Sequence, residues 1–340
     1  MESSGSYEEG VEIMKHLRKS KLAVFDLVFA AFVLAAAPSH AAIAVRAAAG
    51  GVGGGWYTVL AGLAEIVAAE NPDINMQVIP GAGLSNIPRV GEKGVEMAFA
   101  YPPFTKACYA GTNPYQKPYD NIRAIGKGFG SGVIQFVVDE SAGVNSIEDF
   151  VNGKKPLRIA VDRVGTTDEW IFSKVLEFYQ VDYKAIASWG GKVAHAGYGD
   201  QAVLIKDRQV DAIVGNIAVP WTAVMEASIG RKMKILSLSK ECQEYLQQTY
   251  ALIPATIPAG GYNFQTEPVD TVACITQIIT HADVNEDVVY RITKTIFENP
   301  DKVRKVHDSL KDFDPKEAPA DNGAPLHPGA EKYYKEAGLM

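Results

Sequence analysis

Small polar residues and glycines gather at four places where a β-like run is followed by a helical pattern. These loops span residues 50–55, 81–86, 164–168 and 215–216. The first backbone N–H groups of a helix have no partner within the helix, so they can bind a carboxylate or a phosphate. Glycine lets a ligand come close to the backbone, and Ser, Thr or Asn can cap the helix or bind the ligand directly. One such junction is compatible with ordinary capping, but four together favour a shared pocket for a small polar solute.

The predicted elements place all four loops at the same kind of position. The β-like runs cover 43–48, 74–79, 157–161 and 210–214, and helical patterns follow at 56–69, 87–91, 169–179 and near 220–221. This alternation is typical of α/β units with parallel strands. Ligands in open α/β sheets bind at the carboxyl ends of the strands, which is where these loops lie.

The length of the chain predicts two lobes. A chain of 340 residues, of which 47% are hydrophobic, exceeds what a single core usually covers. The β-like run at 133–138 is expected to carry the chain from one lobe to the other, with a return near 232–238. Lobe 1 would then comprise residues 42–131 and 235–340, and lobe 2 residues 132–234, with a ligand cleft between them.

Residues 1–41 are predicted to form a secretory signal peptide. Basic residues between positions 15 and 21 precede an apolar stretch at 22–37, and a small-x-small cleavage site ends at Ala41. An uncleaved membrane anchor is the alternative, but the stretch is shorter than the roughly 20 residues of a spanning helix and contains Asp26. Because residues 1–13 are acidic, we expect translation to begin at Met14. The mature protein is then exported to the periplasm.

Composition and motifs argue against several other classes of protein. The net charge of −7 comes without a long run of Lys or Arg, so nucleic-acid binding is not expected. The glycines at 50–55 lack the third glycine of a dinucleotide-binding motif, and no phosphate loop, nucleophile elbow or HExxH motif occurs. We therefore expect no cofactor, no metal and no catalytic residue. Cys108, Cys242 and Cys274 are expected to be packed thiols, with one disulfide as the alternative.

Six segments of the chain follow the pattern of one known family. They are GGVGGGWYTVLAGLAE (50–65), GAGLSN (81–86), IAVDRVGTTDEW (159–170), VDAIVGNIAVP (210–220), EDVVYRITKTIFEN (286–299) and PLHPGAEKYYKEAGL (325–339). With them the chain resembles the TAXI branch of the solute-binding subunits of tripartite ATP-independent periplasmic (TRAP) transporters. The resemblance implies a type II periplasmic binding-protein fold, in which two α/β lobes close around one small ligand.

The resemblance also implies a function and a set of contacts. Such a protein binds an amino acid or a small carboxylate and delivers it to the membrane permease of a TRAP transporter. The implied ligand contacts are Gly54, Gly55, Trp56, Tyr57, Ser85, Asn86, Tyr101, Gly165, Thr166, Thr167, Asp168 and Asn216. We expect a monomer, because the protein must close and dock on its permease.

Three of these positions depart from the family's pattern. Gly55 stands where a hydroxyl residue is usual, Trp56 where tyrosine is usual, and Asp168 where threonine is usual. Changed hydrogen-bonding groups alter selectivity strongly, so the ligand cannot be copied from relatives. Asp168 has two interpretations, a first-turn acid stabilised by the helix dipole or a partner for an ammonium group of the ligand. Arg46 likewise is either a carboxylate partner or one side of a structural ion pair.

Two other functions fit the same features. The chain could be an exported ligand-sensing protein that signals to a membrane receptor. It could also be an exported α/β enzyme that uses the same cleft, and turnover of a bound metabolite would favour that alternative.

Overall fold

The computed structural model describes residues 42–340 of the chain. The predicted signal peptide, its start at Met14 and its cleavage after Ala41 therefore lie outside the described residues. Among the helices that are described, none combines the length and the hydropathy needed to cross a membrane.

The first group of strands forms around the N-terminal strand of the sheet. β1 (Ile43–Ala48) lies between β2 (Ile74–Ile79) and β3 (Met97–Ala100) and is parallel to both. The predicted strands at 43–48 and 74–79 are confirmed. β3 is buried along its whole length, as parallel strands covered on both faces are.

The second group repeats this arrangement. β5 (Arg158–Val161) lies between β6 (Lys192–His195) and β7 (Ala212–Ile217) and is parallel to both. The predicted strands at 157–161 and 210–214 are confirmed, with shifted bounds for β7. Both groups therefore have the α/β character that the sequence predicts.

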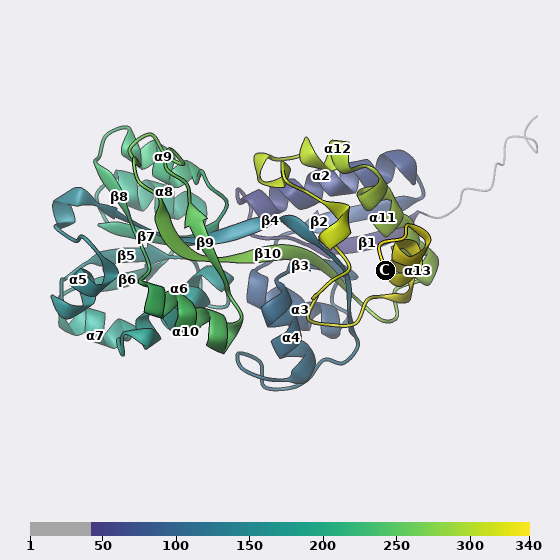
Figure 1. Ribbon diagram of the computed structural model, residues 1–340, viewed down its shortest axis with the longest axis horizontal. Helices are drawn as coiled ribbons and strands as arrows, with labels where there is room; N and C mark the ends of the chain where they lie inside the picture. Colours follow the sequence, from purple (N-terminus) through teal and green to yellow (C-terminus); the bar gives the residue numbers. More distant parts are fainter. Residues whose placement is uncertain (1–41) are drawn as a thin grey trace, which may run out of the picture. The chain divides into compact units, whose positions relative to one another are not determined.

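Two long antiparallel strands run from one group to the other (Figure 1). β4 (Ile122–Asp139) and β10 (Val269–His281) pair with each other; β4 also pairs with β7, and β10 with β3. The end of β4 pairs with β8 (Met233–Leu236), and the start of β10 pairs with β9 (Ile253–Ile257). The main path of this single sheet has the order β2-β1-β3-β10-β4-β7-β5-β6. The lobe boundaries expected at 131 and 234 stay a prediction.

The middle of β4 is irregular. It carries glycine at alternate positions, and two of these, Gly128 and Gly130, have φ angles of +108° and +79°, which side chains other than glycine rarely adopt. The register between β10 and β4 also shifts between Ile275 and Gln277 and again between Ile278 and Ile279. β4 therefore departs from regular strand geometry where it passes between the two groups.

Helices connect the strands in both groups. Those of the first group are α2 (Gly55–Glu70), α3 (Gly83–Gly91), α4 (Pro102–Ala110), α11 (Glu286–Glu298), α12 (Pro300–Arg304) and α13 (Pro328–Glu336). Those of the second group are α5 (Ile147–Asn152), α6 (Thr167–Phe178), α7 (Tyr183–Ser188), α8 (Tyr198–Lys206), α9 (Thr222–Ser228) and α10 (Lys240–Tyr250). Short 3-10 turns are η1 (Glu140–Ala142), η2 (Asp308–Leu310) and η3 (Pro315–Glu317).

Side-chain hydrogen bonds in the first turn explain why two helices begin earlier than predicted. α6 begins at Thr167 and not at residue 169, because the Thr166 hydroxyl accepts a hydrogen bond from the Glu169 N–H at 3.3 Å. α3 begins at Gly83 and not at residue 87. There the Asn86 side chain accepts a hydrogen bond from the Ala82 N–H at 3.0 Å and stabilises the entry into the helix.

Aromatic side chains on β4 contribute to the packing of both groups. Phe129 packs against Phe99, Phe297 and Phe313, with ring centroids 5.9, 5.7 and 5.5 Å away. Seven residues further along, Phe136 packs on Phe150 and Phe172, at 6.1 and 5.6 Å. The strand that links the groups is thus held by apolar contacts in its middle and in its second half.

Two open questions about side chains are settled by the packing. Cys108, Cys242 and Cys274 are all buried and free, so the packed-thiol prediction is confirmed and the alternative of a disulfide is wrong. Burial raises the pKa of Cys108 and of Cys242 to about 12. Arg46 forms an ion pair with Glu96, with Nη2 2.6 Å from Oε1, and this confirms the structural alternative for Arg46.

The buried ion pair between Asp139 and Arg231 leads to a stability prediction. Both side chains are only 5% exposed, and Arg231 also donates to the backbone carbonyl of Ile205. Asp139→Ala leaves the guanidinium buried without its charge partner, so we expect the free energy of unfolding to fall by about 3–5 kcal/mol in urea denaturation. As a control, Glu70→Ala breaks the exposed pair with Lys302 and should cost less than about 1 kcal/mol. Equal losses in the two variants would contradict the prediction.

Candidate functional site

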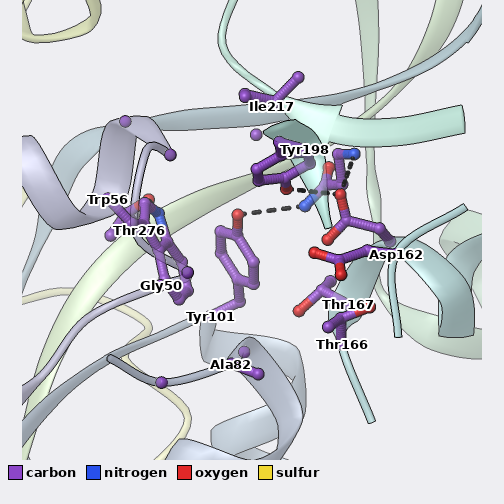
Figure 2. Close-up of a pocket in the computed structure, with 18 of the residues that line it drawn as sticks. Gly50, Trp56, Ala82, Tyr101, Asp162, Thr166, Thr167, Tyr198, Ile217 and Thr276 are labelled. Carbon is purple, nitrogen blue, oxygen red and sulfur yellow. Dashed lines mark hydrogen bonds between the residues drawn. The ribbon is translucent and has the colours of Figure 1, made fainter. Parts of the chain in front are cut away.

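A cavity of about 250 Å³ lies at the carboxyl ends of the strands of both groups (Figure 2). The first group contributes loop residues 50–56 and 81–85 and Tyr101, and the second contributes 162–168, 216–218 and Tyr198. The long strands add Phe129, Ser131 and Gly132 from β4 and Thr276 from β10. The cavity is therefore built by both groups, at the position where ligands of open α/β sheets bind.

Most of the predicted contact residues line this cavity. Those that do are Gly54, Gly55, Trp56, Ser85, Tyr101, Gly165, Thr166, Thr167, Asp168 and Asn216. Tyr57 and Asn86 are absent from its wall. Whether the lining residues bind a ligand stays a prediction, but the structure brings them together from five separate segments of the chain.

Asn86 and Tyr57 stabilise the loops of the cavity wall through hydrogen bonds to the backbone. The Asn86 side chain is 1% exposed and donates to the carbonyls of Ala49 and Phe99, at 2.7 and 2.9 Å. A Cβ atom at Gly81 would lie 2.2 Å from the Asn86 side-chain oxygen, so only glycine fits there. The Tyr57 hydroxyl donates to the Val78 carbonyl at 3.4 Å. These two side chains hold the first and second loops in place.

Trp56 and Tyr101 form an aromatic wall on one side of the cavity (Figure 2). Their ring centroids are 4.7 Å apart, and the Trp56 ring also packs on Phe99 at 5.5 Å. The Trp56 indole N–H donates to the Thr276 hydroxyl at 2.9 Å. Trp56 therefore packs on the core and faces the cavity at the same time.

Polar contacts cross from the first group to the second. The Asn216 side-chain N–H donates to the Tyr101 hydroxyl at 3.1 Å. Because Tyr101 follows β3 and Asn216 lies on β7, this bond joins residues that are far apart in the sheet order. The strand β4 passes close to this bond at Gly132. A Cβ atom there would lie 2.5 Å from the Tyr101 hydroxyl, so only glycine fits at this position.

Asp168 is a buried carboxyl in the cavity wall and is 5% exposed. Its Oδ1 atom accepts hydrogen bonds from the Tyr198 hydroxyl at 2.6 Å and from the Asn216 backbone N–H at 2.7 Å. Burial raises the pKa of Asp168 to about 7; the two hydrogen bonds oppose this rise, and the nearby Asp162 adds to it. The ionisation state of Asp168 near neutral pH therefore depends on the charged and polar groups that lie beside it in the cavity.

Two polar atoms in the cavity wall lack a hydrogen-bond partner within residues 42–340. They are the hydroxyl of Thr167, a residue 2% exposed, and the side-chain carbonyl of Asn216, a residue 5% exposed. A buried polar atom that loses water and gains no partner costs about 1–3 kcal/mol. The wall is therefore complete only with something polar inside the cavity, a solute or ordered water.

Three helices begin at the cavity. α2 starts at Gly55, α3 at Gly83 and α6 at Thr167, and all three residues line it. Their first N–H groups carry the positive ends of the helix dipoles and favour an anionic group. α3 and α6 come so close that a Cβ atom at Gly83 would lie 1.9 Å from the Thr167 hydroxyl oxygen.

Several lining residues were not predicted from the sequence. Asp162 and Arg163 directly follow β5, and their place inside the motif at 159–170 could have identified them. Burial raises the pKa of Asp162, and the adjacent Arg163 opposes this rise. Tyr198 and Thr276 lie in segments without any local signal. In the part of the chain that is described, no cluster of three His, Cys, Asp or Glu side chains could hold a metal ion.

The sequence model of the NMT1-like family matches residues 47–338, which is most of the chain.

Solved structures of similar fold include periplasmic binding proteins. MatC (Rpa3494) from Rhodopseudomonas palustris, with bound malate, is 15% identical with a TM-score of 0.53, over 89% of this chain and 98% of that one. The periplasmic binding protein BugD is 14% identical with a TM-score of 0.53, over 88% and 98% of the two chains. PhnD1 from Prochlorococcus marinus, in complex with methylphosphonate, is 12% identical with a TM-score of 0.51, over 87% and 99%. The predicted type II periplasmic binding-protein fold is confirmed.

The raised pKa of Asp168 predicts how stability varies with pH. The unfolded chain releases this proton near pH 4 and the folded protein near pH 7, so this group lowers the free energy of unfolding as pH rises between them. The loss is at most about 4 kcal/mol. Asp168→Asn should therefore be more stable than the wild type at pH 8 and no different at pH 4, by thermal unfolding without ligand. The exposed Asp312→Asn is the control, and a stability gain that does not vary with pH would contradict the prediction.

The close approach of α3 and α6 predicts that Gly83→Ala is destabilising. The added methyl group collides with the Thr167 hydroxyl, so we expect a loss of about 1–3 kcal/mol. Combining it with Thr167→Ala should recover part of this loss, because the two residues touch. Gly199→Ala, where a Cβ atom meets nothing within 4 Å, is the control. Strictly additive losses in a double-mutant cycle would show that the contact is not formed.

Proposed function

We propose that this chain, which belongs to the NMT1-like family, is an exported solute-binding protein of the periplasm. It captures a small polar solute, an amino acid or a small carboxylate, by closure of two lobes and delivers it to a TRAP-type membrane permease. The observation that carries this proposal is the pair of buried, unpartnered polar atoms, Thr167 Oγ1 and Asn216 Oδ1, in one cavity wall. A bound solute with matching groups would satisfy both atoms and offset their cost.

The size of the cavity supports a small solute. Pockets that hold drug-sized molecules measure roughly 300–1,000 Å³. The cavity here measures about 250 Å³, just below this range, and so suits a compact molecule. Its mixed wall, an aromatic side with Trp56 and Tyr101 and a polar side with Thr167 and Asp168, suits a compact molecule with both polar and apolar parts.

The starts of three helices support a solute that carries an anionic group. α2, α3 and α6 begin at the cavity, so their first N–H groups can hold a carboxylate there. Two proteins of similar fold are described with small anions, MatC with malate and PhnD1 with methylphosphonate. The ligand of this chain differs in the groups around it, because Asp168 is present in the wall.

The finer assignment to the TAXI branch, and with it the TRAP permease, rests on the sequence motifs. The loop motif at 50–65 forms the start of α2 and the motif at 159–170 forms the start of α6, both at the cavity. The motif at 325–339 forms α13, which packs on α11. Of the twelve predicted contacts, we assign the ten in the wall to solute binding, and Tyr57 and Asn86 to support of the loops.

We place the hinge between the lobes in β4 and β10. The first boundary stays near residue 131, in the irregular part of β4. The second boundary was expected at 234. We place it instead in β10, because α10 packs with the second group. The Tyr250 ring lies 4.8 Å from the Trp170 ring, and the Tyr245 hydroxyl donates to Glu177 at 2.7 Å.

The proposed function predicts a solute that can be released, identified and rebound. Purified mature protein should carry a specific small molecule, identified by mass spectrometry after denaturation. Because a ligand that binds only the native state stabilises it, the same molecule should raise the melting temperature in a saturable way. Binding should also change tryptophan fluorescence through Trp56, which lines the cavity. A chemically converted product would favour the enzyme alternative instead.

Thr167→Val tests the cavity without disturbing the fold. Valine has nearly the same shape and lacks the unpartnered hydroxyl, so the free protein should be at least as stable as the wild type. The affinity for the solute should fall about 10- to 150-fold, since one hydrogen bond to a charged group contributes about 1.5–3 kcal/mol. Thr293→Val, whose hydroxyl bonds to the Val289 carbonyl away from the cavity, should leave affinity unchanged. Unchanged affinity in both variants would mean that the solute binds elsewhere.

A further inference from the structure

The charged side chains of the cavity wall carry more negative than positive charge. Two carboxyl groups line it, Asp162 and Asp168, and both are at least nine-tenths buried. Arg163 is the one basic side chain in the described wall, and it is exposed. With both carboxyl groups ionised, these three residues sum to one net negative charge. A dianion would meet like charges in a confined space, whereas a molecule with a cationic group would be attracted.

The hydrogen bonds of Asp168 leave one of its oxygens available. Both bonds from other residues end on Oδ1, and one of the donors is the backbone N–H of Asn216. A backbone N–H can only donate, so Oδ1 acts as an acceptor, and Oδ2, which accepts no bond from another residue, is the better place for a proton. Oδ2 is then the oxygen that either holds the proton of the neutral acid or faces a cation.

A separate observation indicates that the solute also carries an anionic group. The Thr167 hydroxyl is buried, has no partner within the described residues, and lies at the start of α6 against the start of α3. Both helices are long enough to have a defined N-terminal dipole, at 12 and 9 residues. A carboxylate at this point would accept from the hydroxyl and from free N–H groups. In Figure 2, Thr167 and Asp162 lie on the side of the cavity opposite Trp56.

We propose, on the basis of the solute-binding function above, that the solute bears a protonated amine held by Asp168 and Asp162 and has a net charge of zero or above. In a zwitterion, the carboxylate lies at the starts of α3 and α6 beside Thr167. The site thereby discriminates against dicarboxylates, through repulsion by two buried carboxyl groups and not through size. This selectivity belongs to the Asp168 position, where the resembling family has threonine.

The same geometry couples binding to protonation. Because burial raises the pKa of Asp168 to about 7, a good part of the empty protein carries a neutral Asp168 at that pH. An ammonium group favours the ionised form, so its binding expels the proton. The other titratable or charged groups that act on this region are Asp162, Tyr101, Tyr198, Cys274, Arg163 and His195. Binding of an amine therefore releases protons and strengthens as pH rises toward 8.

The experiment compares matched pairs of solutes that differ in the amine. The probes are the neutral and basic L-amino acids and γ-aminobutyrate. Each is paired with the acid that lacks its amine, either the 2-hydroxy acid or the unsubstituted acid. Succinate and malate serve as dianions. Affinity and proton release are measured by titration calorimetry in two buffers of different ionisation enthalpy, from pH 5 to pH 8. We expect binding by amine-bearing members only, with proton release and an affinity that rises by up to about tenfold per pH unit below pH 7.

Two variants separate recognition from folding. Asp168→Asn keeps an acceptor for Tyr198 and Asn216, so it should fold and should bind the amine at least about 30-fold more weakly. It should also abolish the proton release and the pH dependence. Asp312→Asn changes an exposed carboxyl outside the cavity wall and should leave both the affinity and the proton release intact.

Each outcome has a distinct meaning. If a dicarboxylate or a deaminated acid binds better than its amine partner, or binds with proton uptake, the amine assignment is overturned and solute binding stands. Equal affinity of wild type and Asp168→Asn for an amine also overturns it. If no probe of any class binds and no small molecule is released from the purified protein, the proposed function itself fails.

Discussion

β4 and β10 each have to pair with strands of both groups, and this requirement fixes where the cavity forms. β10 pairs with β3, so Tyr101 at the end of β3 lies close to the middle of the sheet. β4 pairs with β7, which brings Asn216 to the same region from the other group. The bond between these side chains follows from the pairing of the long strands, and so does the convergence of the loops around them.

The cavity combines features that oppose stability. A buried carboxyl, two unpartnered polar atoms and the starts of three helices lie within one small volume. Each of these costs free energy in the empty protein and would be satisfied by a polar ligand. The apolar contacts of Phe129 and Phe136 along β4 contribute stability next to this region. Ten of the twelve contacts implied by the family resemblance lie in this region.

The features that could be predicted from the sequence are those that depend on residues close together in the chain. Strands at 43–48 and 74–79 were predicted with their observed bounds because apolar β-like runs end there at glycine-containing loops. Asn86 was assigned to the ligand, yet its amide bonds to backbone groups of Ala49 after β1, Ala82 before α3 and Phe99 on β3, and no local pattern distinguishes these two directions. Tyr198 reaches Asp168 across 30 residues. Such a contact forms because α6 and α8 begin after the neighbouring parallel strands β5 and β6, whose pairing only the folded chain determines.

The alternate glycines in the middle of β4 give this strand unusual mechanics. Gly128 and Gly130 have positive φ angles, so the backbone there already departs from extended geometry. Other elements fill the space left by the missing Cβ atoms, because a Cβ atom would lie 2.2 Å from the Tyr334 hydroxyl at Gly126 and 2.5 Å from the Tyr101 hydroxyl at Gly132. If the two groups rotate against each other, as the proposed function requires, glycines at these positions can absorb the change in backbone angles over several residues instead of at a single pivot.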